Sequence, residues 1–156
     1  ERVKSYRPWS NTPDGKWCTN CSSDDIGNYI NISDMGTTLF IKKSYKDCRI
    51  MRNLGFTDSI WLQNEGCIPS EKIIIDLVRR FNRIIIFFDN DIVGQKQALK
   101  LASIFNEYFP DKTEAFWLPE KLNRDLNIKD PGEFVAKKGD KELKALLKKK
   151  GYLPNS

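Results

Sequence analysis

The segment that most constrains this chain is an apolar run over residues 83–88, followed at once by Asp89, Asn90 and Asp91. β-Branched and aromatic residues in a run of this length predict a buried, parallel strand. Residues two apart on an extended backbone project to the same side, so Asp89 and Asp91 can offer oxygen ligands to one Mg²⁺-sized ion or to an adjacent pair. Gly94 then permits a close turn into a helix. Asp-Asn-Asp is also good turn chemistry, but its place at a strand end favours a metal site over a solvated turn.

Strand and helix patterns alternate from residue 37 onward. Strands are expected at 38–41, 59–62, 83–88 and 114–118. Helices are expected after each of the first three strands, near 133–136 and at the lysine-rich end. The first helix has a Ser44-x-x-Asp47 capping box at its start and Gly55 near its end. The second has Pro69 near its start and an apolar face of Ile74, Leu77, Val78 and Phe81, and the third has an apolar face of Ala98, Leu101, Ala102, Phe105 and Tyr108. Asp140 is expected to cap the last helix, which runs through Lys149. Four strands separated by helices favour a parallel α/β sheet of about four strands flanked by helices, with right-handed crossovers.

The domain organisation follows from composition. Residues 1–35 are rich in turn formers and predict a small β-rich N-terminal segment, residues 36–150 form the α/β domain, and residues 151–156 are a tail. A length of 156 residues suits one compact unit with extensions. The first residue, Glu1, is compatible with a piece of a longer protein. No apolar segment approaches the ~20 residues that span a bilayer, so a soluble, cytoplasmic protein without a membrane partner is expected.

Charge and missing residue types narrow the chemistry. The net charge is +5, and residues 137–150 hold seven lysines against two acids, which is compatible with a phosphate-rich partner. Histidine is absent, which excludes histidine-based catalysis and histidine-ligated zinc. Cys18 and Cys21 form a C-x-x-C pair, but Cys48 and Cys67 stand apart from it, so buried or incidental thiols are expected rather than a zinc site.

Polar side chains follow each predicted strand. Lys43 comes after the first, Glu65 after the second, Asp89 and Asp91 after the third, and Asp130 lies in the loop after the fourth. Because the carboxyl ends of parallel strands meet at one edge of a sheet, we expect these side chains to converge there.

On these residues the chain resembles the TOPRIM family, the metal-binding catalytic fold of bacterial-type primases, type IA and II topoisomerases and some nucleases. Phe87-Phe88-Asp89-Asn90-Asp91-x-x-Gly94 is similar to the acidic DxD motif of the family, and residues 129–133 resemble the downstream Asp-Pro element of primases. The match covers residues 37–149. Residues 16–20 after Arg7-Pro8 resemble the subdomain that precedes TOPRIM in primases, most nearly those of phage type.

One departure from the family pattern concerns the end of the first strand. Where the family carries a glutamate and a glycine, this chain has Lys43 and Ser44, while Asp47 matches the aspartate that follows. A charged lysine cannot bind Mg²⁺, and it reverses the local charge. The Lys-Ser pair is similar to that of phage-type members, although it also fits a site with altered or lost chemistry.

The resemblance implies a DNA primase fragment that makes short RNA primers on single-stranded DNA from nucleoside triphosphates, with a replicative helicase as a further partner and the host cytoplasm as location if the gene is phage-encoded. Mg²⁺ or Mn²⁺ is the implied cofactor, held by Asp89, Asp91 and Asp130, and Lys43, Asp47 and Glu65 are the implied catalytic residues. Template or nucleotide contacts are expected from Arg2, Lys4, Arg7, Lys16, Asn20 and Lys43, with Trp9 or Trp17 stacking on a base.

Two other functions fit the same residues. A TOPRIM nuclease uses similar ligands to cut a phosphodiester, although the β-rich leader argues against it. A non-catalytic module would keep the sheet edge for binding nucleotide or DNA after loss of the glutamate. The N-terminal basic residues, and Lys137, Lys138 and residues 148–150, are equally compatible with solvated faces.

Overall fold

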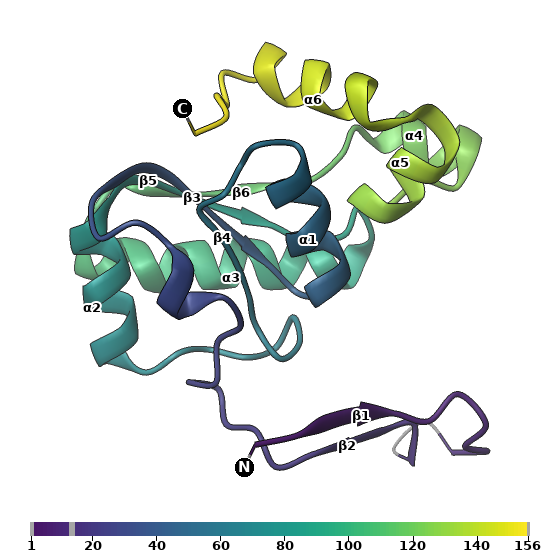
Figure 1. The fold of residues 1–156 in the computed structure, drawn as a ribbon, viewed down its shortest axis with the longest axis horizontal. Helices are drawn as coiled ribbons and strands as arrows, with labels where there is room; N and C mark the ends of the chain where they lie inside the picture. The colour runs from purple at the N-terminus through teal and green to yellow at the C-terminus, as the bar shows by residue number, and fades with distance from the viewer. Residues whose placement is uncertain (1, 13–14, 156) are drawn as a thin grey trace.

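The computed structural model describes residues 2–12 and 15–155. Its centre is a four-stranded sheet in the order β4-β3-β5-β6, with every pair of neighbours parallel (Figure 1). The strands are β3 (Gly36–Lys42), β4 (Ser59–Trp61), β5 (Phe81–Phe87) and β6 (Thr113–Phe116). The predicted α/β class is therefore confirmed, and the carboxyl ends of the strands share one edge of the sheet.

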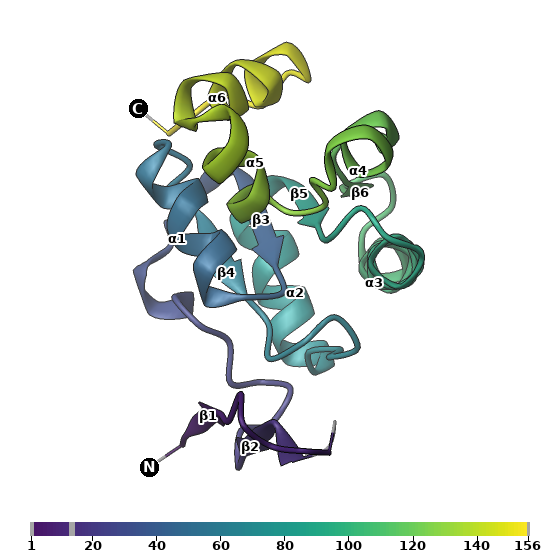
Figure 2. The same ribbon diagram turned by 90° about the vertical axis from the view of Figure 1, so that its right-hand side faces the viewer.

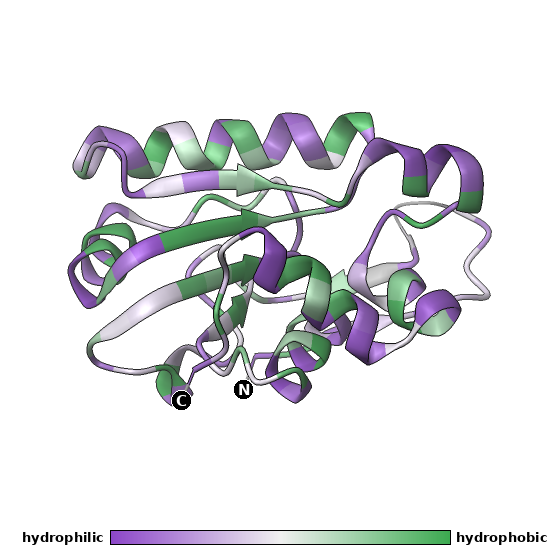
Figure 3. Ribbon diagram, turned by 90° about the horizontal axis from the view of Figure 1, so that it is seen from above, coloured by the Kyte–Doolittle hydropathy of each residue, from purple (hydrophilic) through white to green (hydrophobic). Residues whose placement is uncertain are grey.

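Helices cover both faces of the sheet because apolar side chains alternate along its two long strands. Leu39, Ile41, Ile84 and Ile86 pack with α2 (Glu71–Arg80) and α3 (Ile92–Tyr108). Phe40, Ile85 and Phe87 pack on the other face with α1 (Tyr45–Asn53), α4 (Glu120–Leu126), α5 (Pro131–Lys138) and α6 (Asp140–Lys149). Figure 2 shows α1 and α6 on the side of the sheet away from α3. Figure 3 shows apolar residues along the central strands and a mixture of polar and apolar residues along the helices.

The turn from β5 to α3 is unusually close. A Cβ on Gly94 would lie 2.4 Å from the backbone oxygen of Asp89, so a side chain has no room there. Asp91 caps α3, because its Oδ1 accepts a hydrogen bond of 2.8 Å from the Gly94 N–H. The predicted role of Gly94 is thus confirmed, and the turn delivers Asp89, Asn90 and Asp91 to the sheet edge.

The N-terminal residues form a hairpin that lies apart from the sheet. β1 (Lys4–Tyr6) and β2 (Trp17–Thr19) pair antiparallel, which confirms a β-rich leader. A 3₁₀ helix (Tyr29–Asn31) follows, and Gly27 forms a bridge with Trp61 on the edge strand β4. In Figures 1 and 2 the hairpin and α6 lie at opposite ends of the molecule.

Several details differ from the sequence-based expectations. Phe81 begins β5 instead of closing the second helix, since it lies opposite Gly36, whose missing side chain leaves space for the Phe81 ring. Tyr108 is 39% exposed at the end of α3, not buried. Gly139, at a φ of 94°, precedes α6, so Asp140 is its first residue and makes no side-chain cap. Helix α4 was not anticipated. No helix within the described residues is long and apolar enough to cross a membrane.

Candidate active site

Three side chains from three strand ends meet at the sheet edge, as predicted. Lys43, just past β3, forms an ion pair with the Glu65 carboxylate after β4. The same ammonium lies 2.5 Å from Asp89 Oδ2 after β5. The Lys43 side chain is 24% exposed and that of Asp89 only 4%. One lysine therefore bridges two carboxylates in a partly buried setting.

Burial and pairing act in opposite directions on these groups. For Lys43, burial disfavours the charged form, but hydrogen bonds and attraction from Asp89 and Glu65 outweigh it and raise the pKa above its ordinary value. For Asp89, burial raises the pKa of the carboxyl, and the Lys43 ammonium only partly offsets this. Lys43 therefore carries a full charge at neutral pH and is the principal counter-charge of Asp89.

Asp91 and Asp130 each cap a helix with one oxygen and face a lysine with the other. The Asp130 Oδ1 accepts from the Glu133 N–H at 2.7 Å, and its Oδ2 lies 3.2 Å from Lys46 Nζ. Burial opposes ionisation of Asp130, but the Glu133 N–H and the Lys46 charge outweigh it and lower the pKa of the carboxyl. The Asp91 Oδ2 lies 3.9 Å from Lys129 Nζ. Every carboxylate expected to bind metal thus has a lysine beside it.

Asn90 ties the acidic loop to the loop before α5. Its N–H donates to the Lys129 carbonyl at 2.8 Å, and its own carbonyl accepts from Asn123 Nδ2 at 2.6 Å. Its side-chain oxygen accepts from Gln95 Nε2 at 2.7 Å. These bonds hold Asp91 and Asp130 at the same end of the sheet. Neither Asn90 nor Asn123 was predicted, because the partners are more than thirty residues apart and no local pattern joins them.

Lys42, next to Lys43 in the chain, is a lysine of the site that the sequence analysis did not identify. It is 1% exposed, its Nζ has no hydrogen-bond partner, and it lies 3.3 Å from the centre of the Phe87 ring. Burial lowers the pKa of Lys42 to about 8, with attraction from Asp47, Asp89 and Asp130 as a smaller opposing effect. The alternation of β3 was the available signal, since it sends Lys42 toward the α1 face and Lys43 toward the other.

Asp47 lies beneath the same edge and is also buried. Its Oδ2 accepts a hydrogen bond of 2.6 Å from Ser44 Oγ, and the Ser44 hydroxyl accepts from the Asp47 N–H at 3.2 Å, which confirms the predicted helix start. The Asp47 Oδ1 is buried without a hydrogen-bond partner. Such an oxygen is costly unless a cation or a ligand completes its environment.

The donor set suits a hard divalent ion, but the acids do not surround one common point. Carboxylate oxygens are the ligands that Mg²⁺ prefers, and the unpartnered oxygen of Asp47 adds one more. Within residues 2–12 and 15–155, however, no three acidic or cysteine side chains are grouped to hold an ion. Metal binding would have to displace the lysines, so the predicted metal site stays a prediction.

Cys18, Cys21, Cys48 and Cys67 are free thiols.

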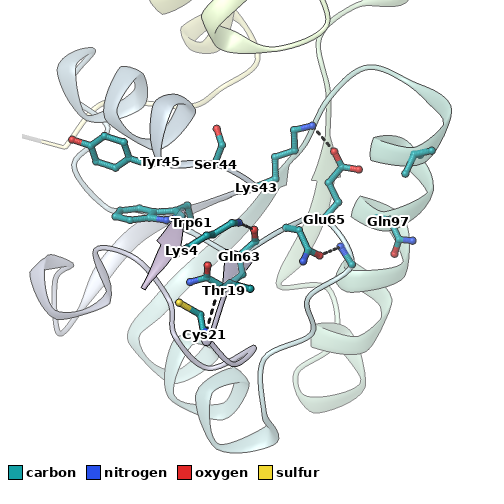
Figure 4. Close-up of a pocket in the computed structure, with 13 residues that line it drawn as sticks. Lys4, Thr19, Cys21, Lys43, Ser44, Tyr45, Trp61, Gln63, Glu65 and Gln97 are labelled. Carbon is teal, nitrogen blue, oxygen red and sulfur yellow. Dashed lines mark hydrogen bonds and ion pairs between the residues drawn. The ribbon is translucent and has the colours of Figure 1, made fainter. Parts of the chain in front are cut away.

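A cavity of about 780 Å³ lies between the hairpin and this edge of the sheet (Figure 4). Lys43 and Glu65 line it from the sheet side, and Lys4 and Thr19 line it from the hairpin. The Lys4 ammonium also donates to the Gln63 carbonyl, which connects the two parts of the chain. The candidate site therefore opens into a space large enough for a nucleotide.

The other predicted N-terminal contacts lie elsewhere. Arg2 pairs with Asp25 at 2.9 Å, and Asn20 Oδ1 accepts from the Val3 N–H at 2.6 Å, so both stabilise the hairpin. Arg7 and Lys16 are exposed and face each other across the hairpin, where their backbones are hydrogen-bonded at 2.7 Å. Trp9 is 77% exposed. Stacking by Trp17 concerns a side chain outside the described part of the structure. Nucleic-acid contacts by these residues stay predictions.

The fold matches that of DNA primase catalytic cores. The primase fragment of the bacteriophage T7 primase-helicase protein matches with a TM-score of 0.61 and 19% identity, over 82% of this chain and 50% of that chain. The E. coli primase catalytic core matches with a TM-score of 0.65 and 17% identity, over 96% and 48%. A DnaG primase catalytic domain bound to single-stranded DNA matches with a TM-score of 0.66 and 17% identity, over 95% and 47%.

No protein-family model and no curated protein sequence matches this chain. The chain spans about half the length of the solved primase structures, and its identity to them is below 20%. Likeness at this level establishes a common fold. The expected parallel α/β fold of about four strands flanked by helices, with its small β-rich leader, is therefore confirmed.

Proposed function

We propose that this chain is part of the catalytic core of a DNA primase, which joins nucleoside triphosphates into short RNA primers on single-stranded DNA. The observation that carries the proposal is the meeting of Lys43, Glu65 and Asp89 beside the cavity between the hairpin and the sheet, which Lys43 and Glu65 line. An acidic strand end beside a nucleotide-sized space suits phosphoryl transfer, in which positioning and charge neutralisation dominate.

The residues of the site divide the work. Lys43 is placed to contact a phosphate of the incoming nucleotide, because this residue lines the cavity while Asp89 and Glu65 orient its ammonium. Lys4 contributes a second positive charge from the hairpin side. Arg7 and Lys16, exposed on the same hairpin, would hold the template by its phosphates. Lys43 acts as a cation here, and not as a general base in place of glutamate.

A divalent ion, Mg²⁺ or Mn²⁺, would be held by Asp89, Asp91 and Asp130, and the unpartnered oxygen of Asp47 would be available as a further ligand. When bound, it would supply charge neutralisation at the triphosphate and a lower pKa for the attacking 3′-hydroxyl. The lysines beside these carboxylates hold the acids in place when no cation is present. Lys43 cannot leave the site entirely, because its backbone is fixed at the end of β3.

The same pairing of every carboxylate with a lysine favours one alternative, a non-catalytic module that binds nucleotide or DNA. In that case Lys43, Lys46 and Lys129 permanently take the place of metal. The primase proposal includes a replicative helicase as partner, since one of the similar structures is a fragment of a primase-helicase protein. The cytoplasm as the place of action is a further part of the same proposal.

Primer synthesis tests the proposal. The chain is incubated with a single-stranded template, nucleoside triphosphates and Mg²⁺ or Mn²⁺, and oligonucleotide products are resolved by length. Asp89→Asn should lower synthesis at least a hundredfold, because it removes the most buried of the three carboxylates proposed to hold the metal. Glu107→Gln, an exposed change on α3, is the matched control and should retain full activity. Titration calorimetry with Mn²⁺ should show weaker binding for Asp89→Asn.

Each result points to one function. Oligonucleotides from the wild type and none from Asp89→Asn support the primase. Cleavage of the template in place of synthesis would indicate a nuclease. Binding of nucleotide without synthesis or cleavage, and without metal affinity, would indicate the non-catalytic module. Equal Mn²⁺ affinity in Asp89→Asn and wild type would remove Asp89 from the metal site.

A further inference from the structure

A second basic surface lies next to the candidate site, on the exposed face of α1. Arg49 and Arg52 are both exposed, and neither guanidinium pairs with any residue in the described part of the chain. They follow Tyr45 at helical spacing, so the three side chains share one face of α1. The helix rises about 1.5 Å per residue, which places Tyr45 and Arg52 roughly 10 Å apart along its axis.

An aromatic pair connects this face with the candidate site. The rings of Tyr45 and Trp61 lie 5.2 Å apart at an angle of 69°, and Figure 4 shows them next to each other. Gly27 packs closely against the indole ring of Trp61, because a Cβ at position 27 would lie within 2 Å of that ring. Tyr45 and Trp61 line the large cavity that contains Lys43. They also line a neighbouring cavity of about 290 Å³ that contains Arg49 and Arg52.

The chemistry of this surface matches one class of ligand. Unpaired guanidinium groups attract phosphates, and exposed aromatic rings offer a stacking surface to unpaired bases. A stacked strand advances about 3.4 Å per nucleotide, so the length of the α1 face suits roughly three nucleotides. A duplex has its bases already stacked and would gain only the phosphate contacts.

We propose that Tyr45, Arg49, Arg52 and Trp61 form a track that holds the single-stranded DNA template where it passes the candidate active site. This inference rests on the proposed primase function, to which it adds the path of the template. The phosphates lie along Arg49 and Arg52, a base packs against Tyr45 and Trp61, and the strand continues into the cavity that Lys43 and Lys4 line.

The track is tested by measuring how tightly a fluorescently labelled oligothymidylate of twelve nucleotides binds to the full chain, without nucleoside triphosphates or metal. The double variant Arg49→Gln with Arg52→Gln should bind at least tenfold more weakly. The slope of log K against the logarithm of the salt concentration should also be shallower by about 1.4, since each lost phosphate contact accounts for about 0.7 of this slope. The control, Lys96→Gln with Lys100→Gln, removes the same charge from α3 on the opposite face of the sheet.

Tyr45→Leu separates stacking from charge. Tyr45 is 56% exposed, so the change leaves the core intact. Affinity for the oligothymidylate should fall about tenfold with an unchanged salt slope, and affinity for a duplex should not change.

Two outcomes overturn the track: equal affinity and slope in the arginine and lysine double variants, or equal binding by Tyr45→Leu and the wild type. Failure of the wild type to make primers would overturn the proposed function alone, because the binding assay needs no synthesis. Primer synthesis together with unaffected binding by the arginine variant would overturn the track alone.

Discussion

At the scale of single residues, the site is an array of paired charges. Lys43, Lys46 and Lys129 lie beside Asp89, Asp130 and Asp91 respectively. Unit charges about 4 Å apart interact by about 4 kcal/mol at an effective dielectric near 20, before the cost of removing them from water. The lysines therefore keep several carboxylates together at one sheet edge without a bound ion. A metal ion would compete with them, so its affinity depends on how readily they move aside.

Lys42 is the residue whose protonation should be most visible in stability. Its pKa is lowered to about 8 by burial, whereas the unfolded chain keeps a value near 10.5. Between these pH values the unfolded state binds a proton that the folded state does not, so stability rises with pH. Relative to Lys42→Met, the wild type should gain about 2 to 3 kcal/mol in free energy of unfolding from pH 7 to pH 10.

Urea unfolding of both proteins at each pH measures this difference. Comparison with the methionine variant cancels the titration of the other groups, and Lys141→Met on exposed α6 serves as the control, for which the difference from wild type should not vary with pH. A constant difference between wild type and Lys42→Met would mean that Lys42 keeps its charge throughout, neutralised by Asp47, Asp89 and Asp130.

At the scale of elements, the turn from β5 to α3 fixes the acidic loop. Gly94→Ala would bring a methyl group within 2.4 Å of the Asp89 backbone oxygen, and backbone cannot swing away as a side chain can. The free energy of unfolding should fall by about 2 kcal/mol, even though alanine is the better helix former. Primer synthesis should fall as well, because Asp89 would be displaced.

Gly132→Ala is the matched control near the start of α5. Its Cβ would meet the end of the Lys46 side chain at 2.6 Å, and this side chain is flexible and 59% exposed. The gain in helix propensity, about 1 kcal/mol, should then leave stability equal or higher. If both variants were equally stable, the closeness of the β5–α3 turn would not constrain the loop.

The helices and strands also show which features of the fold can be predicted from the sequence. The apolar runs of β3 and β5, the cap at Ser44 and the glycine at position 94 carry local signals, so the sheet and the meeting of Lys43, Glu65 and Asp89 were predictable. Helix α4 has only Leu122 buried, and so it lacks the amphipathic pattern that reveals a helix. The lysine partners and the Asn90 links join residues distant in sequence, which only the three-dimensional fold brings together.

At the scale of the whole molecule, the hairpin is a wall of the cavity and contributes little to the core. The buried hydrophobic residues of the described chain begin at Ile32. The hairpin itself is linked to the sheet domain by the hydrogen bond from Lys4 to the Gln63 carbonyl. The segment after it adds bonds from Gln63 Nε2 to the Asp25 carbonyl at 2.5 Å and from the Ser70 N–H to Asp24 at 2.6 Å, and the Gly27–Trp61 bridge. The links made by this segment would survive removal of the hairpin.

A chain that begins at Ser22 should therefore remain folded and lose function. Its free energy of unfolding should fall by no more than about 1 to 2 kcal/mol, because the lost contacts are exposed ion pairs and hydrogen bonds. Its affinity for single-stranded DNA should fall several-fold and its primer synthesis should disappear, since Lys4, Arg7 and Lys16 are gone and the cavity has lost one wall. Urea unfolding and oligonucleotide binding measure the two effects separately. Unchanged DNA affinity in the folded, shortened chain would show that the template is held by the sheet domain alone, and a collapse of stability would show that the hairpin belongs to the core.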